Sequence, residues 1–266
     1  ATALSWVSFG EADFSTGIAF GGGRAVLGMA QTISRTLNVW SYDHGSKRVS
    51  TLSYPWNLSE LDLIAPELVS SFAPREPLYH EGTFWMACGS GGLVRLESLT
   101  SATATVFWPG GDKQAFPTSQ FPSKAISGYP DTTKAVISIA GADSGPLFVA
   151  TSRLVWEFNP ADTTWDSLPA TLETTAGSLV AFQQIFARPD STRDLYARIV
   201  VKQGSAEYDS LYRFDTQSSE WKLFPAQKTS PSTISFGPSD SLYVLNRSAL
   251  ALFQGTQPTL KAIDEN

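Results

Sequence analysis

The sequence predicts an all-β protein, a β-propeller built of five four-stranded blades. The first observation is an internal repeat, because residues 156–169 match residues 213–225 in outline. In each copy an aromatic residue is followed seven positions later by Trp and three positions further on by another large apolar residue. Such a repeat marks a unit that buries its apolar face only by stacking on copies of itself. The second observation is that no long segment has helical periodicity.

Weaker copies of the repeat extend this pattern along the chain. They are Tyr42/Val49/Leu52, Leu96/Thr103/Val106 and Phe253/Leu260/Ile263. The first positions of all copies fall at 42, 96, 158, 214 and 253, separated by 54, 62, 56 and 39 residues. Spacings of this size suit four short strands per blade, so five blades are the direct count. A ring of six, with one degenerate blade, is the alternative.

Each copy reads as an inner hairpin, a polar turn and an outer strand. The inner hairpins are apolar runs divided by a tight turn, at 147–150 with 154–158 and at 242–245 with 250–253. The turns after the aromatic residue contain Asx, Gly or Pro, as at 43–46, 159–162 and 215–218. Outer strands begin near Trp165 and Trp221, which we expect to pack between blades, and Pro169 or Pro225 ends the pairing.

The N-terminal region resembles an outermost strand. Residues 6–10, followed by 18–21, match residues 221–225 followed by 234–237. We expect this strand to close the ring by pairing with the last blade, which removes two exposed edges. A sixth, degenerate blade and a truncated blade are the competing interpretations. Residues 1–266 are expected to form one domain and a monomer.

Composition excludes several classes of protein. Apolar residues make up 42% of the chain and eight Trp are present, which excludes disorder, and no run is apolar enough to span a bilayer. The net charge of −6 and the absence of a Lys/Arg cluster argue against nucleic acid. The single Cys88 excludes an intrachain disulfide, and we expect it to be a small buried hydrophobe. Scarce Lys and abundant Ser, Thr and aromatic residues favour an extracellular or periplasmic location.

Three segments carry a family resemblance. The run Phe158-Asn159-Pro160 with Trp165 resembles the Tyr-Asp-Pro-(x)4-Trp segment of Kelch repeats, and Gly91-Gly92 is similar to the Kelch double glycine. The run 147–152 resembles blades of two-component-regulator-type propellers. The resemblance covers two blades well and three poorly. It implies a propeller that binds a protein or carbohydrate without catalysis.

Two long insertions, 55–80 and 109–133, are the predicted binding regions. Both leave from an outer strand, so both are expected on the same face of the propeller. Aromatic and acidic side chains on loops above a rigid scaffold suit ligand recognition. The candidate binding residues are Trp56, Glu60, Asp62, Phe116, Phe121 and Tyr129. The competing interpretation is that these loops fold over the central opening of the ring.

The alternative function is a five-bladed-propeller glycoside hydrolase. Such enzymes need two carboxylates flanking the glycosidic bond, and five acids lie near the first insertion: Glu60, Asp62, Glu67, Glu76 and Glu81. Their spacing selects no pair, so no catalytic residue is assigned. The sequence has no metal-ligand spacing and predicts no metal and no cofactor. Gly21-Gly22-Gly23 lacks the residues of a phosphate cradle and predicts a β-turn instead.

Overall fold

A computed structural model of the chain describes fourteen stretches of residues. These are 18–31, 36–55, 77–89, 92–100, 104–110, 113–116, 135–173, 177–188, 191, 194–224, 233–236, 241–245, 249–254 and 257–262. The chain divides into two compact units, residues 1–108 with 112–135, and residues 109–111 with 136–266. The predicted closing strand at 6–10 lies outside the described residues, and one domain for 1–266 stays a prediction.

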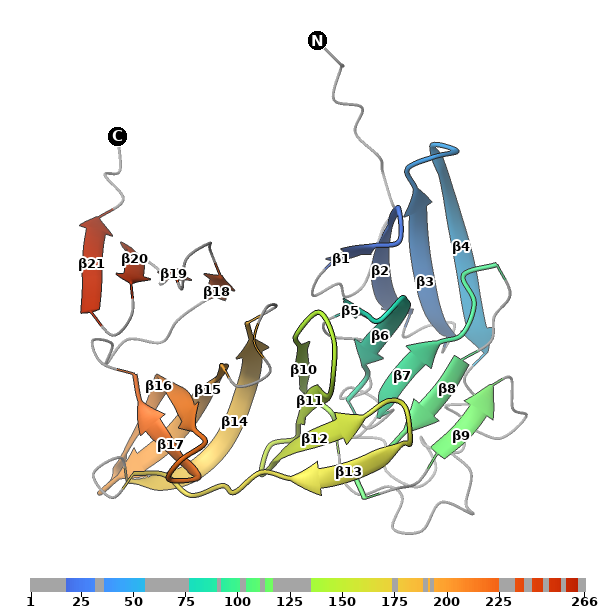
Figure 1. Ribbon diagram of the computed structural model, residues 1–266. Helices are drawn as coiled ribbons and strands as arrows, with labels where there is room; N and C mark the ends of the chain where they lie inside the picture. Colours follow the sequence, from blue (N-terminus) through green and yellow to red (C-terminus); the bar gives the residue numbers. More distant parts are fainter. Residues whose placement is uncertain are drawn as a thin grey trace. The chain divides into compact units, whose positions relative to one another are not determined.

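The described part of the first unit forms two antiparallel sheets (Figure 1). One contains β1 (Ile18–Gly21), β2 (Arg24–Gln31), β3 (Thr36–Asp43) and β4 (Arg48–Pro55). The other contains β5 (Pro77–His80), β6 (Thr83–Ala87), β7 (Leu93–Leu96), β8 (Ala104–Phe107) and β9 (Lys113–Phe116).

The described part of the second unit forms three four-stranded antiparallel sheets (Figure 1). The first contains β10 (Ser138–Gly141), β11 (Leu147–Ala150), β12 (Val155–Asn159) and β13 (Thr164–Ser167). The second contains β14 (Ser178–Ala187), β15 (Leu195–Gln203), β16 (Ala206–Asp215) and β17 (Glu220–Leu223). The third contains β18 (Thr233–Phe236), β19 (Ser241–Leu245), β20 (Ala249–Gln254) and β21 (Gln257–Ala262).

Every sheet is a meander in which strands consecutive in the chain are hydrogen-bonded neighbours. This confirms the predicted all-β fold and the two inner hairpins, β11–β12 and β19–β20. The described residues contain no helix. Accordingly, no described helix has the length and apolarity to cross a membrane.

The seven-residue spacing of the repeat is the register of a hairpin. Phe158 pairs directly with Trp165, and Phe214 pairs directly with Trp221. Tyr42 and Val49 pair in the same way. Directly opposed residues share one face of a sheet, so the spacing places two large side chains side by side.

In two of the weaker copies the seven-residue spacing is not the register of the hairpin. Leu96 pairs with Ala104, eight positions on, rather than with Thr103. Phe253 pairs with Pro258, and Leu260 lies opposite Ala251. The connection between two strands sets their register, and these connections differ in length from the one the repeat assumes.

Three outer hairpins share one turn geometry. Four residues separate the last pairs, Asp43 with Arg48, Asn159 with Thr164 and Asp215 with Glu220. The fourth turn residue has a positive φ in each: Lys47 at 58°, Thr163 at 61° and Ser219 at 56°. In the first turn Lys47 adopts this conformation, although Gly45 lies two residues earlier.

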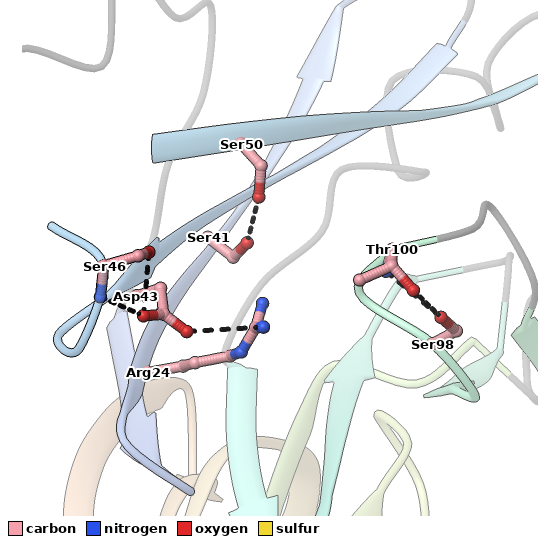
Figure 2. A network of polar contacts seen from close by, with 7 residues as sticks. All are labelled: Arg24, Ser41, Asp43, Ser46, Ser50, Ser98 and Thr100. Carbon is pink, nitrogen blue, oxygen red and sulfur yellow. Dashed lines mark hydrogen bonds and ion pairs between the residues drawn. The ribbon is translucent and has the colours of Figure 1, made fainter. Parts of the chain in front are cut away.

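Asx side chains hold these turns, as predicted. Oδ1 of Asp43 accepts from the backbone N–H of Ser46 at 2.7 Å, and Oδ1 of Asn159 accepts from that of Ala161 at 3.0 Å. Figure 2 shows the first of these turns, where Asp43 also pairs with Arg24 at 3.4 Å. The hydrogen bond from Ser46 is the largest cause of a lowered pKa at the Asp43 carboxyl.

The strained turn position gives a stability prediction. Thr163→Gly is expected to stabilise the second unit by about 0.5–1 kcal/mol, because a β-branched residue is strained at positive φ and Gly is not. Urea unfolding of the wild type and the variant measures the difference. Thr164→Gly, one residue further on in β13, is the control and is expected to destabilise. A Thr163→Gly variant as unstable as the control would contradict the assignment of strain.

The apolar faces of neighbouring sheets form the core, as a stacked repeat requires. In the second unit one cluster joins β10–β13 to β14–β17 and contains Phe148, Ile199 and Trp221. A second joins β14–β17 to β18–β21 and contains Leu211, Phe224 and Val244. Each sheet is too thin to bury its own side chains, so these inter-sheet clusters supply the hydrophobic stabilisation.

The two repeat tryptophans differ in burial. Trp221 is 0% exposed, and its ring contacts those of Phe182 and Phe214. Trp165 is only half-buried and contacts the rings of Phe158 and Trp156. Because Trp221 also belongs to the cluster that joins β10–β13 to β14–β17, packing between sheets is confirmed for Trp221.

The second predicted insertion contains a strand. Lys113–Phe116 forms β9 and pairs with β8, so this sheet has five strands rather than the predicted four. The run has no β-branched residue, which is why the sequence did not reveal it. Because β9 reverses the chain, Phe116 lies opposite Ala104 at the start of β8. The chain that follows β4 therefore leaves at the end of the sheet where the fourth strand ends, whereas the chain that follows β9 leaves at the opposite end of its own sheet. This is contrary to the prediction that both insertions share one face.

The Gly-rich segment is a turn, as predicted. Gly21 pairs with Arg24, and both Gly22 and Gly23 have positive φ, at 54° and 72°. Two such residues define the tight turn whose twist matches that of the hairpin.

Candidate functional site

A cleft of about 280 Å³ lies between the sheets β10–β13 and β14–β17. Both sheets belong to the second unit. The lining residues are Pro146, Phe148, Glu157, Leu168, Leu195, Phe214 and Thr216. Six of the seven carry no charge, and Glu157 is an acid.

Strand register explains why these side chains converge. Phe148 of β11 pairs directly with Glu157 of β12, so both project from the same face of their sheet. On the other wall, Leu195 begins β15 and Phe214 lies one residue before the end of β16. The cleft therefore opens at the end of the second sheet that carries the β14–β15 and β16–β17 connections.

The apolar walls continue the core. Phe148, Leu195 and Phe214 are buried members of the cluster that joins the two sheets, and Leu168 packs against it. Glu157 is half-buried. Within the described residues its carboxylate makes no hydrogen bond and no ion pair. A concave apolar surface with a few polar groups is typical of a small-molecule site.

A second polar cluster, on the other face of β14–β17, serves the framework. Asp194 accepts a hydrogen bond from Nε of Arg188 at 3.1 Å and another from Arg213 at 2.5 Å. The Arg188 guanidinium lies over Phe236 of β18, at 5.2 Å from the ring centroid. The cluster therefore connects the β14–β15 connection to the neighbouring sheet.

Asp194→Asn is expected to destabilise the second unit by about 2 kcal/mol, because it removes the negative charge that pairs with the buried Arg188 and with Arg213. Fully buried pairs cost about 3–5 kcal/mol when broken; the figure is lower here because Arg213 is 46% exposed. Urea unfolding measures the change. Glu97→Gln, which breaks the more exposed pair with Arg95, is the control and is expected to cost less than about 1 kcal/mol. Equal effects would contradict the framework role.

Two other ionisable side chains, those of Asp215 and Cys88, also have structural roles. A hydrogen bond from Lys222 is the main cause that lowers the pKa of Asp215 to about 2. Cys88 is completely buried, and burial raises the pKa of its thiol, which confirms the predicted small hydrophobe. In the ranges that the structure describes, no three His, Cys, Asp or Glu side chains cluster tightly enough to hold a metal ion.

The predicted binding residues are mostly outside the described part of the chain. Trp56, Glu60, Asp62, Phe121 and Tyr129 all lie there. Phe116 ends β9, so it belongs to a strand rather than to a loop. None of the cleft residues was predicted. The available signal was Glu157, a carboxylate that alternates with the apolar Trp156 and Phe158 along β12 and so faces the opposite side.

Comparisons with known proteins give matches in structure alone. No family model and no curated protein matches the sequence. Among solved structures, the extracellular domain of a B. thetaiotaomicron hybrid two-component system matches with a TM-score of 0.59 at 11% identity, over 98% of this chain and 29% of that one. The Dos1 propeller matches with a TM-score of 0.53 at 11% identity, over 93% of this chain and 61% of that one. Kuenenia stuttgartiensis hydrazine synthase matches with a TM-score of 0.56 at 9% identity, over 99% of this chain and 70% of that one.

This chain has the β-propeller fold. Identities this low establish the fold and nothing further. The chain spans about three-tenths of the two-component domain. No family model supports the Kelch resemblance, and the number of blades and the closure of the ring stay predictions.

In propeller terms the cleft lies between two neighbouring blades, whose first strands are β10 and β14. It opens at the blade end that carries the first-to-second and third-to-fourth strand connections. The chain leaves the fourth strand of a meander at the opposite end. Leu168, the first residue of the connection from β13 to β14, also lines the cleft.

Proposed function

We propose that this chain is a non-catalytic recognition propeller. The observation that carries the proposal is the inter-blade cleft, a concave apolar surface that presents one carboxylate. Such a surface suits reversible binding.

We place the chain outside the cytoplasm, in the periplasm or the extracellular space. Two similar propellers support this, because they are extracellular domains of B. thetaiotaomicron two-component systems, at 11% and 15% identity. Those chains are about three times longer than the matched part. This chain is accordingly proposed to act as part of a larger binding assembly.

The proposed macromolecular partner is a protein or a glycan, bound at the two insertions, which form separate contacts because they leave from opposite ends of their sheets. Aromatic side chains there would supply stacking surface, and acids would accept hydrogen bonds from hydroxyl groups. The residues proposed for this contact are Trp56, Glu60, Asp62, Phe116, Phe121 and Tyr129.

A glycan array, followed by titration calorimetry on the best glycan or on a purified protein partner, tests this proposal. We expect saturable binding without turnover, weakened at least about tenfold by Trp56→Ala or Tyr129→Ala. Tyr208→Ala is the control, because this exposed tyrosine belongs to β16 and to neither insertion. Hydrolysis of a glycan by the wild type, abolished in Glu60→Gln or Asp62→Asn, would contradict the proposal and establish a glycoside hydrolase instead.

A further inference from the structure

The packing of the two sheets does not explain why the Glu157 carboxylate lies in the inter-blade cleft. It is half-buried beside Phe148, its direct partner on the next strand. No described side chain or backbone group forms a hydrogen bond or an ion pair with it. A carboxylate that is partly removed from water loses hydration, and an unpaired one is costly to retain.

The cleft has a negative field. Glu157 is the sole charged group among its lining residues. Asp166 pairs with Glu157 on the following strand and adds a second negative charge on the same face. Coulomb attraction is stronger beside apolar walls than in bulk water, because the effective dielectric constant is lower there. The cleft is therefore electrostatically complementary to a cation.

The remaining lining residues favour an organic cation over a metal ion. Magnesium and calcium need about six oxygen ligands, whereas this cleft offers one carboxylate and the hydroxyl of Thr216. Phe148 and Phe214 instead provide aromatic surface, which attracts ammonium groups and their methyl or methylene substituents.

The size of the cleft limits the ligand. A volume of about 280 Å³ is close to the lower end of the roughly 300–1,000 Å³ that is usual for small-molecule pockets. A small molecule with a compact apolar body fits this volume, whereas a folded partner does not.

We propose that the inter-blade cleft binds a small organic ammonium ion. The ammonium group pairs with the Glu157 carboxylate, and the apolar body packs against Phe148, Leu195 and Phe214. The inference rests on the proposed function, since it names the ligand class of a recognition propeller.

Choline tests this inference, against the uncharged isostere in which a tert-butyl group replaces the trimethylammonium group. Calorimetry or chemical-shift titration of the whole chain is expected to show choline binding on the order of tenfold more tightly than the isostere. Glu157→Gln is expected to abolish that preference while leaving the weak binding of the isostere unchanged.

Glu207→Gln is the matched control. This exposed acid lies on β16 seven residues before Phe214, which is roughly 23 Å along the strand. It is expected to bind choline like the wild type. Circular dichroism checks that both variants are folded.

Two results would overturn the inference: no saturable choline binding, or equal binding of choline by the wild type and Glu157→Gln. Neither bears on the glycan or protein binding tested at the insertions. Conversely, turnover of a glycan would refute the proposed function without affecting the choline preference.

Discussion

Trp221→Ala is expected to destabilise the second unit by about 3–5 kcal/mol. The indole is completely buried, and its ring contacts Phe182 and Phe214. Its Nε1–H donates to the carbonyl oxygen of Pro169 at 3.0 Å. Alanine would leave a cavity at the junction of two blades and orphan that carbonyl.

The backbone of Trp221 adds to this effect. Its N–H donates to the carbonyl oxygen of Thr171 at 2.9 Å, and its carbonyl accepts from the N–H of Glu173 at 3.1 Å. These bonds attach the segment that follows β13 to β17, the outer strand of the next blade. A collapse around Trp221 would loosen this attachment as well as the core.

Urea unfolding followed by near-UV circular dichroism measures the change. Leu223→Ala, two residues further along β17 and 41% exposed, is the control and is expected to cost less than about 1 kcal/mol. Trp165→Ala is expected to lie between the two, at about 1–3 kcal/mol, because that indole is only half-buried. Equal losses at Trp221 and Leu223 would refute the placement of Trp221 in the core.

Gly21→Ala is expected to destabilise the first unit by about 2–3 kcal/mol. A Cβ atom at Gly21 would lie 2.0 Å from Cγ of Tyr79, on the neighbouring blade. That atom lies on the axis of the ring flip, so rotation of the ring about χ2 does not relieve the overlap, and the whole side chain or the backbone must shift. Glycine lets β1 approach β5 this closely.

Two variants separate this clash from loss of turn geometry. Gly23→Ala meets no atom within 4 Å but has a φ of +72°, so it reports turn strain alone, about 1 kcal/mol. Tyr79→Ala combined with Gly21→Ala is expected to recover part of the loss relative to the sum of the single variants. Strict additivity in urea unfolding would contradict a direct contact between these two residues.

The sequence predicted the features that depend on local chemistry. The seven-residue spacing of Phe158 with Trp165 is a hairpin register, and the Asx residues at 43, 159 and 215 sit where a turn uses them. The same reasoning failed for Leu96 and Phe253, because those residues are too common to mark a register. It also missed β9, which has no β-branched residue among its four positions.

The candidate site could not be predicted from short segments of the sequence. Its lining side chains come from five segments that are distant in the sequence and meet because two sheets stack. Nothing in the residues around Glu157 indicates that Phe214, more than fifty positions away, lies across the cleft. The predicted insertion residues were chosen for their exposure on loops, which is a property of single segments.

The sequence by itself determined the class of fold, since strand, turn and repeat signals act between near neighbours in the chain. Tertiary structure alone decided which tryptophan is buried, where a cleft opens and which carboxylate lacks a partner. The physical reason is that burial and pairing depend on the face that each sheet presents to the next. Inter-sheet packing sets that arrangement over long sequence distances.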